Sequence, residues 1–189
     1  MRPAVFLDRD GTMIHDVGYL ARREDVRWFP STVDAVRLLN RAGVLVFVVT
    51  NQGGIGLGVV TEAFVRETHQ WMGETLSAAG AHVDGWLFCP HHPRAVIPEL
   101  RIACDCRKPA RGLIDAALAT HEIDVARSFV VGDKQIDVDL AASVGARGVL
   151  VRTGYGEGEL ARLGGVLPGA AHVAPDLMAA IAWILRQQP

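Results

Sequence analysis

Short apolar runs rich in β-branched residues alternate with longer segments of helical periodicity, and this alternation is the strongest constraint on the fold. The expected strands are 4–7, 44–49, 86–88, 128–131 and 148–151, with a weaker one at 172–173. The expected helices are 32–42, 62–79, 113–121, 137–144 and 176–186. Strands that are apolar throughout and separated by helices are typical of a parallel sheet covered on both faces. We therefore predict an α/β fold built on a doubly wound parallel sheet.

The composition indicates a compact soluble domain without a nucleic-acid partner. A chain of 189 residues, 50% hydrophobic, can bury a full core as one domain over 1–189. The balance of 19 basic against 21 acidic residues gives a net charge of −2, which argues against nucleic-acid binding. We find neither a signal-peptide pattern nor an apolar run near the ~20 residues that span a membrane. We expect a cytoplasmic protein without membrane contact, and a monomer because no long exposed apolar face is evident.

Polar residues directly after the first strand are the first candidates for chemistry, because ligands bind outside the carboxyl ends of parallel strands. Asp8 and Asp10 can point the same way, and Gly11 permits a tight turn close to a ligand. Two carboxylates in one site can serve as an ionised nucleophile and a general acid. The alternative is a structural Asx-turn that caps a helix.

Polar groups also follow the second strand and precede the third predicted helix. The segment Thr50-Asn51-Gln52-Gly53 offers a hydroxyl, carboxamides and unhindered backbone N–H groups to an anion. It is not a Walker loop, and alone it would be read as a flexible loop. Lys108 could supply positive charge to a phosphoryl group, although an isolated Arg-Lys pair is usually only solvated.

A third acidic position follows the fourth strand. Asp133 could complete an oxygen-rich site with Asp8, and the ion that such a site favours is Mg²⁺. Alternatively, Asp133 or Asp137 only caps the next helix. Because groups suited to phosphate or magnesium occur at each of these strand ends, we favour the functional interpretation.

The three cysteines lie together in a segment that interrupts the alternation, an apparent loop insertion at 89–108. Cys89, Cys104 and Cys106 with one histidine would give zinc a closed tetrahedral set of ligands, which is typical of a structural site. His91 is the better fourth ligand and His92 the reserve. The alternative is three thiols without metal; a disulfide is disfavoured by spacing and compartment.

The ordered motifs Asp8-x-Asp10-Gly11-Thr12, Thr50, Lys108 and Gly132-Asp133-x-x-x-Asp137 resemble the haloacid dehalogenase superfamily of phosphatases. The resemblance implies a Rossmann-like fold and aspartyl-phosphate chemistry. Asp8 would attack phosphorus, while Asp10 would protonate the departing oxygen and later deprotonate the hydrolytic water. Thr50 and Lys108 would stabilise the transferring phosphoryl oxygens.

The same resemblance implies how the metal would be held. Mg²⁺ would bind Asp8, the backbone carbonyl of Asp10 and Asp133, and would offset repulsion between nucleophile and substrate. Asp137 would orient Lys108 or a metal-bound water. No large cap domain is expected, and the glycine-rich tail after Gly154 is interpreted as a mobile connection without an assigned role.

Within the superfamily, the chain is similar to the zinc-containing heptose 1,7-bisphosphate 7-phosphatases along nearly its whole length. The matching segments are Phe6–Thr12, Cys89–Pro93 and Cys104–Pro109. This similarity implies removal of the 7-phosphate in nucleotide-heptose and surface-polysaccharide biosynthesis. Arg107 and Lys134 would recognise the substrate at its second phosphate, where a guanidinium suits bidentate binding. The remaining residues expected to bind substrate are Asp16, Val17, Gly18, Tyr19, Thr50, Asn51, Gln52, Gly53 and Lys108.

Two other functions are kept as alternatives. The histidinol-phosphatase branch shares the zinc loop, so the zinc ligands do not decide the substrate. A phospho-accepting receiver module also combines an acidic cluster with Thr and Lys on a doubly wound sheet. In receivers, however, the phosphorylated Asp follows a middle strand, and a zinc loop has no place there.

Overall fold

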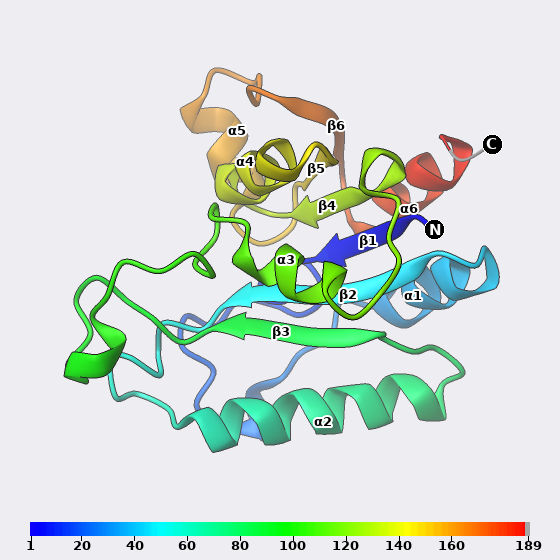
Figure 1. Ribbon diagram of the computed structural model, residues 1–189. Coiled ribbons are helices and arrows are strands. Elements are labelled where there is room, and N and C mark those ends of the chain that lie inside the picture. Colours follow the sequence, from blue (N-terminus) through cyan, green and yellow to red (C-terminus); the bar gives the residue numbers. More distant parts are fainter. Residues whose placement is uncertain (188–189) are drawn as a thin grey trace.

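The computed structural model describes residues 1–187 and contains a six-stranded, all-parallel sheet flanked by six α-helices (Figure 1). The strands are β1 (Ala4–Leu7), β2 (Leu45–Asn51), β3 (Gly85–Cys89), β4 (Phe129–Gly132), β5 (Arg147–Val151) and β6 (Ala170–Ala174). The helices are α1 (Thr32–Arg41), α2 (Glu62–Ala78), α3 (Gly112–Leu118), α4 (Gln135–Val144), α5 (Gly156–Arg162) and α6 (Leu177–Arg186).

The strand order is β3-β2-β1-β4-β5-β6, so the chain winds outward from β1 in both directions. Every neighbouring pair is parallel. The structure confirms the predicted doubly wound α/β fold. Because β1 lies beside both β2 and β4, the loops after these three strands meet at one edge, at the point where the winding reverses.

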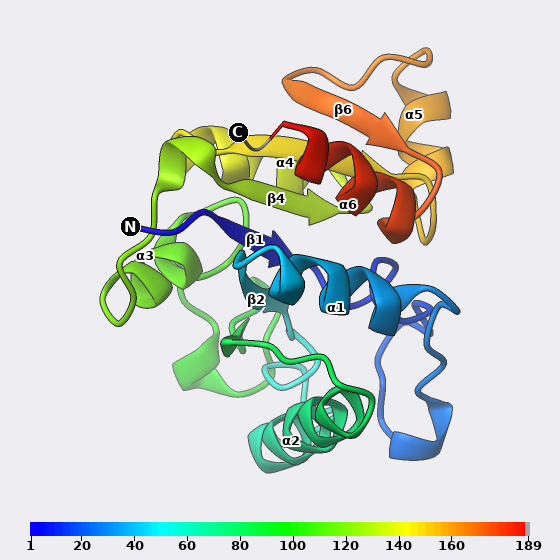
Figure 2. The same ribbon diagram turned by 90° about the vertical axis from the view of Figure 1, so that its right-hand side faces the viewer.

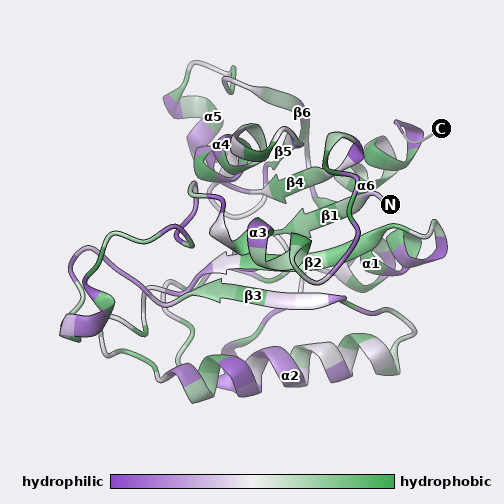
Figure 3. Ribbon diagram, in the orientation of Figure 1, coloured by the Kyte–Doolittle hydropathy of each residue, from purple (hydrophilic) through white to green (hydrophobic). Residues whose placement is uncertain are grey.

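Each face of the sheet carries its own apolar core, because successive strand side chains point to opposite faces. Val5 and Leu7 pack with residues of α1, α2 and α6, whereas Ala4 and Phe6 pack with residues of α3 and α4. Figure 2 shows α1 and α6 on one side of the sheet and α3 on the other. The strands are accordingly mostly hydrophobic in Figure 3, with a pale stretch in β3, whereas α2 carries many hydrophilic residues.

The loop between β3 and α3 extends beyond the carboxyl ends of the strands (Figure 1). Its only regular element is a short 3-10 turn at Pro98–Leu100. This is the insertion that the cysteine-rich segment predicts.

The segment after Gly154 differs from its sequence prediction. It is not an irregular connection: α5 follows directly, and the weak strand expected at 172–173 is the five-residue strand β6, which pairs with β5. Gly156 is needed because a Cβ there would lie 1.9 Å from the backbone oxygen of Val151. Close packing, rather than mobility, accounts for glycine at this position.

Within residues 1–187, no helix combines the length and the apolar character that crossing a membrane would require.

Candidate active site

Asp8 and Asp10 lie in the turn that follows β1, and both line a pocket at the carboxyl edge of the sheet. Oδ1 of Asp8 accepts hydrogen bonds from the backbone N–H of Arg9 at 2.8 Å and pairs with Nζ of Lys108 at 2.9 Å. Gly11 has φ +85°, a conformation that L side chains rarely adopt, and its carbonyl accepts the hydroxyl of Thr153. The turn therefore holds both carboxylates against the pocket.

The carboxyl end of β2 and the residue after it supply a network of amide side chains. Nε2 of Gln52 donates to Oδ2 of Asp10 and to Oγ1 of Thr50, each at 2.9 Å. Asn51 exchanges two hydrogen bonds with the backbone of Lys108, one to its carbonyl at 3.2 Å and one from its N–H at 3.0 Å. All five of these residues line the pocket together with Asp8, and the side chains of Asn51 and Gln52 also position their neighbours.

Lys108 is buried between two carboxylates. Its Nζ lies 2.7 Å from Oδ1 of Asp137 and 2.9 Å from Oδ1 of Asp8. Burial alone would lower the pKa of Lys108, but the negative charges of Asp137 and Asp8 raise it above its ordinary value. The ammonium group is therefore fixed in its charged form beside Asp8.

Asp137 is the third residue of α4, and both its oxygens accept hydrogen bonds. Oδ1 faces Lys108, and Oδ2 accepts the backbone N–H of Lys134 at 3.2 Å in a capping box. Both interpretations made from the sequence therefore describe part of its environment: Asp137 caps the helix and also orients Lys108.

Asp133 is fully buried, and its surroundings fit a hard cation. Its Oδ2 accepts the backbone N–H of Tyr155 at 2.8 Å, whereas Oδ1 has no hydrogen-bond partner among the described residues. Burial and the charge of Asp8 raise the pKa of Asp133 to about 7, against the opposing effect of Lys134. Oxygens of Asp8, Asp133 and Asp137 lie within 4.8 Å of one another. A buried carboxylate oxygen that accepts no hydrogen bond from the described residues and has, as a nearby cation among them, only the Lys134 ammonium group at 3.7 Å, fits Mg²⁺, which prefers oxygen ligands.

The pocket has a volume of about 140 Å³. This is well below the ~300 Å³ at which sites for drug-sized ligands begin, so it suits a group of phosphate size. Its lining residues are Asp8, Asp10, Asp16, Gly18, Tyr19, Thr50, Asn51, Gln52, Gly53, Gly54, Lys108, Lys134 and Ile136.

Most residues expected to bind substrate lie at this pocket, but two do not line it. Val17 is exposed, and the neighbouring Asp16 accepts the backbone N–H of Gly18 at 2.7 Å. Arg107 lies beside Gly53, and its Nη1 donates to the backbone oxygen of His91 at 2.8 Å. Arg107 thus connects the rim of the pocket to the cysteine-containing loop.

Lys134 borders the pocket between two acidic groups and an aromatic ring. Its Nζ lies 3.4 Å from Oδ2 of Asp16, 3.7 Å from Oδ1 of Asp133 and 4.4 Å from the centre of the Tyr155 ring. Burial lowers the pKa of Lys134, but the carboxylates of Asp133, Asp8 and Asp16 raise it overall. A cation is thereby maintained on this side of the pocket.

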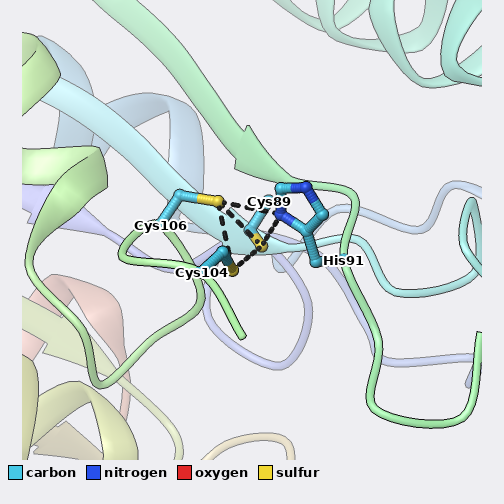
Figure 4. A group of neighbouring side chains, drawn as sticks. All are labelled: Cys89, His91, Cys104 and Cys106. Atoms are coloured by element: carbon cyan, nitrogen blue, oxygen red, sulfur yellow. Dashed lines mark hydrogen bonds between the residues drawn. The ribbon is translucent and has the colours of Figure 1, made fainter. Parts of the chain in front are cut away.

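The side chains of Cys89, His91, Cys104 and Cys106 point toward one another at the end of β3 and in the following loop (Figure 4). The Cys89–Cys106, Cys104–Cys106 and Cys89–Cys104 sulfur separations are 3.1, 3.5 and 3.7 Å. Nδ1 of His91 lies 3.2 Å from the Cys106 sulfur. A tetrahedral site with Zn–S bonds of about 2.3 Å has sulfur separations of about 3.8 Å, so the donor set fits zinc.

The three thiols of the cluster differ in the direction of their pKa shifts. Burial and the neighbouring thiols raise the pKa of Cys106, and burial raises that of Cys89. Burial opposes ionisation of Cys104 too, but hydrogen bonds from Cys106 and from the backbone of Arg107 lower its pKa overall. Three thiolates this close would repel one another unless a cation balanced them. His92 lies outside the cluster, where its Nδ1 accepts the backbone N–H of Arg94.

Several residues at the site carry no role in the sequence interpretation. Gly54 and Ile136 line the pocket, and Tyr155 contacts Asp133 and Lys134. Arg9 is buried against Asp10, and its guanidinium also meets the buried ring of His69, which lies 60 positions away in the chain. Arg9 lies between the two aspartates that follow β1, but no local pattern signals its pairing with His69.

Comparison with known proteins places this geometry in a family context. The HAD-hydrolase-like family model matches residues 105–180. D-glycero-beta-D-manno-heptose-1,7-bisphosphate 7-phosphatase of Rhodopseudomonas palustris is 44% identical over 147 residues, which cover 78% of this chain and 82% of that protein. The D-glycero-D-manno-heptose-1,7-bisphosphate 7-phosphatase of Thermosynechococcus vestitus is 40% identical over 190 residues, covering 97% and 95%.

A solved structure shows the same similarity in three dimensions. The D,D-heptose 1,7-bisphosphate phosphatase of B. bronchiseptica, crystallised with magnesium and phosphate, aligns with a TM-score of 0.86 and 31% identity. The alignment covers 100% of both chains.

Proposed function

The chain belongs to the family of D-glycero-D-manno-heptose-1,7-bisphosphate 7-phosphatases, HAD-like phosphoric monoester hydrolases, and we propose that it removes the 7-phosphate from a heptose 1,7-bisphosphate. The observation that carries the proposal is the convergence of Asp8, Asp10, Thr50 and Lys108 on one phosphate-sized pocket. We extend it to the role that the resemblance implies, in nucleotide-heptose and surface-polysaccharide biosynthesis.

In the first chemical step, a carboxylate oxygen of Asp8 attacks phosphorus and the bond from phosphorus to the sugar oxygen breaks. Asp10 gives its proton to the departing oxygen, which leaves as an alcohol. The charged group of Lys108, 2.9 Å from Asp8, and the hydroxyl of Thr50 bind the phosphoryl oxygens.

In the second step, water attacks phosphorus of the aspartyl phosphate, and Asp10 takes up a proton from that water. The bond between phosphorus and the Asp8 oxygen breaks, so phosphate leaves and the carboxylate is restored. Mg²⁺, when held by Asp8, the carbonyl of Asp10 and Asp133, would neutralise charge on the phosphoryl group. The crystallised relative was complexed with magnesium and phosphate, which supports the choice of ion.

We propose that Cys89, His91, Cys104 and Cys106 hold a structural zinc ion. All four positions would be protein ligands, which leaves none open for catalysis. The loop that the ion would fix runs directly from Cys106 into Arg107 and Lys108. Zinc would therefore act on catalysis by fixing where these two side chains project.

For recognition of the sugar and its second phosphate, we propose Lys134 and Arg107 together with Asp16, Gly18 and Tyr19. Four of these line the pocket, and Arg107 lies at its rim. A compact bisphosphate could then place one phosphate in the pocket beside Asp8, while the sugar and the second phosphate extend past Lys134 toward Arg107 at the rim. Val17 remains a sequence prediction, as do the monomeric state, the cytoplasmic location and the absence of nucleic-acid and membrane partners.

Histidinol phosphate is the less favoured substrate, because the relatives described above are named for heptose 1,7-bisphosphate. The test is product analysis by phosphorus NMR with purified protein and Mg²⁺. We expect the signal of the C7 phosphate to disappear while that of the C1 phosphate persists. Loss of the C1 phosphate, or the same turnover by Asp8→Asn, would contradict the proposal.

A further inference from the structure

Arg9 is an unusual core residue, because a charged side chain is here among the largest that are fully buried. It is 2% exposed. A guanidinium buried in this way is costly unless its donors find acceptors, and charged groups are rarely buried without partners. The acceptors around Arg9 therefore indicate what the residue does.

Two of those acceptors are the carboxylate of Asp10 and the amide oxygen of Gln52, a residue that itself binds Asp10. Nε of Arg9 lies 3.2 and 3.1 Å from Oδ1 and Oδ2 of Asp10, and Nη2 lies 3.0 Å from Oδ1. Nη2 also donates to Oε1 of Gln52 at 3.0 Å, while Nε2 of Gln52 donates to Oδ2 of Asp10. Donors on two sides thus fix the plane of the Asp10 carboxylate at the pocket wall.

The remaining acceptor is His69, a buried residue of α2. Its Nε2 lies 3.0 Å from Nη1 of Arg9. The ring stacks on Trp86 at 5.0 Å between centroids and meets Phe88 edge-on at 5.7 Å. Burial, with the charges of Arg9 and Arg66, lowers the pKa of His69 to about 3. The ring is therefore neutral, and Nε2 can accept from a guanidinium that only donates.

We infer that Arg9 and His69 are positioning residues, which hold Asp10 in the geometry needed to pass a proton to the leaving oxygen. This inference rests on the proposed function, because it concerns the general acid of the same site. His69 restrains the far end of the guanidinium, and Arg9 transmits that restraint to Asp10. Proton transfer requires hydrogen-bond reach, so a displaced Asp10 would slow the cleavage that depends on it.

The test uses leaving groups that differ in their need for a proton. The sugar oxygen that departs from an alkyl phosphate, such as the heptose bisphosphate, must receive a proton as it leaves. The p-nitrophenolate group of p-nitrophenyl phosphate leaves without one. His69→Phe keeps an aromatic ring between Trp86 and Phe88 but removes the Nε2 acceptor. We expect it to lower kcat/KM for the alkyl phosphate at least about 10-fold, and that for p-nitrophenyl phosphate by less than about 3-fold.

Two further variants separate positioning from packing. His69→Gln restores an acceptor near the place of Nε2, so it should recover much of the activity on the alkyl phosphate. Met72→Leu alters a buried residue one turn along α2 without touching the network, and should change both substrates equally and little. Arg9→Met should give the same selective loss, more strongly, if the variant folds.

The ratio of the two kcat/KM values decides the inference. If His69→Phe lowers both values equally, or lowers neither, the network is structural and the inference is wrong. The proposed function fails separately if the wild-type protein hydrolyses other alkyl phosphates but not the heptose bisphosphate; the ratio is then measured with one of those esters. A wild-type protein that hydrolyses neither class of ester would overturn both.

Discussion

Asp8, Asp133 and Asp137 are buried around a single buried ammonium group, that of Lys108. Lys134 adds a second, partly buried ammonium group 3.7 Å from Oδ1 of Asp133, so two ammonium groups face three carboxylates. Burial, and after it the charge of Asp8, raises the pKa of Asp133 against the opposing charge of Lys134. A divalent cation beside Asp8 and Asp133 would balance the remaining negative charge and would offset the cost of burying an ionised Asp133.

A substitution at Gly154 can test whether the position of Asp133 matters for the proposed magnesium site. A Cβ on Gly154 would lie 2.2 Å from Oδ2 of Asp133 and 2.5 Å from Cα of Gly11. We predict that Gly154→Ala displaces Asp133, so that more Mg²⁺ is needed for half-maximal activity and kcat/KM falls at least about 10-fold at limiting Mg²⁺.

The matched control is Gly164→Ala. Gly154 and Gly164 have φ angles of +58° and +71°, but a Cβ on Gly164 would meet nothing within 4 Å. Both substitutions carry the strain of a positive φ, on the order of 1 kcal/mol. Only Gly154→Ala should change the Mg²⁺ titration. Equal titrations for the two variants would show that the position of Asp133 does not affect Mg²⁺ binding.

At the level of elements, the loop from Cys89 to Lys108 connects the proposed zinc site to the catalytic pocket. Its carboxyl end is held twice, by the paired hydrogen bonds between Asn51 and Lys108 and by Arg107 bonding to His91. Displacement of the loop would thus move the lysine that faces Asp8.

We predict that Cys104→Ser loses zinc, lowers the melting temperature by at least about 5 °C and lowers kcat/KM, because one ligand of a closed site is replaced. Metal analysis and thermal unfolding of protein purified without chelator provide the measurement. His92→Asn is the control, since His92 lies outside the cluster. Zinc retained in full by Cys104→Ser, or lost equally from His92→Asn, would refute the ligand assignment.

The elements that local pattern predicts well are those whose residues are apolar on every position. β1 is found where it is expected. β2 begins one residue later and ends two residues later than predicted, because its apolar core is continuous but the strand runs on through the polar Thr50 and Asn51. α5 was missed because Gly156 and Gly158 are poor helix formers. The close approach of Gly156 to Val151 that requires glycine is a tertiary fact and has no local signature.

The residues of the candidate site also fall into two groups, those that the sequence predicts and those that depend on tertiary packing. Asp8, Asp10, Thr50 and Asp133 follow strands whose carboxyl ends meet, so their proximity follows from the predicted topology. The pairing of Arg9 with His69 depends on how α2 packs across the sheet, and no spacing in the sequence encodes it. Arg107 lies at the rim rather than in the pocket. The sequence did not predict this position, because the course of an irregular loop cannot be read from its composition.

For the whole molecule, net charge was the wrong scale on which to look for an anionic ligand. The chain carries −2 overall, yet Lys108 and Lys134 line one small pocket. Two ammonium groups thus face the place where a phosphorylated sugar would bind, although Asp8, Asp10 and Asp16 line the same pocket. The positive charge that a phosphate needs can therefore be local, and the net charge of the chain does not report it.

The buried neutral His69 should make the stability of the whole fold sensitive to acid. The pKa of His69 is about 3 in the folded protein, against an ordinary value of 6.5 that applies to the unfolded chain. Unfolding at a pH between these two values therefore takes up a proton. Stability from this group is complete above pH 6.5 and is lost as the pH falls toward 3. By linkage, the loss from pH 7.5 to pH 5 is about 2 kcal/mol.

The measurement compares urea unfolding of wild type and His69→Phe at pH 7.5 and pH 5. Other titrating groups are common to both proteins, so the difference in unfolding free energy isolates His69. We predict that wild type loses about 2 kcal/mol more than the variant on acidification. An unchanged difference would show that His69 is not held neutral.

Substrate recognition by this pocket is tested by comparing kcat/KM for heptose 1,7-bisphosphate and histidinol phosphate. If the polar and charged groups bind a second phosphate, as we propose, the pocket should reject a substrate that lacks one. We predict a preference for the heptose bisphosphate of at least about 100-fold with Mg²⁺ present. Equal values, or a preference for histidinol phosphate, would contradict it.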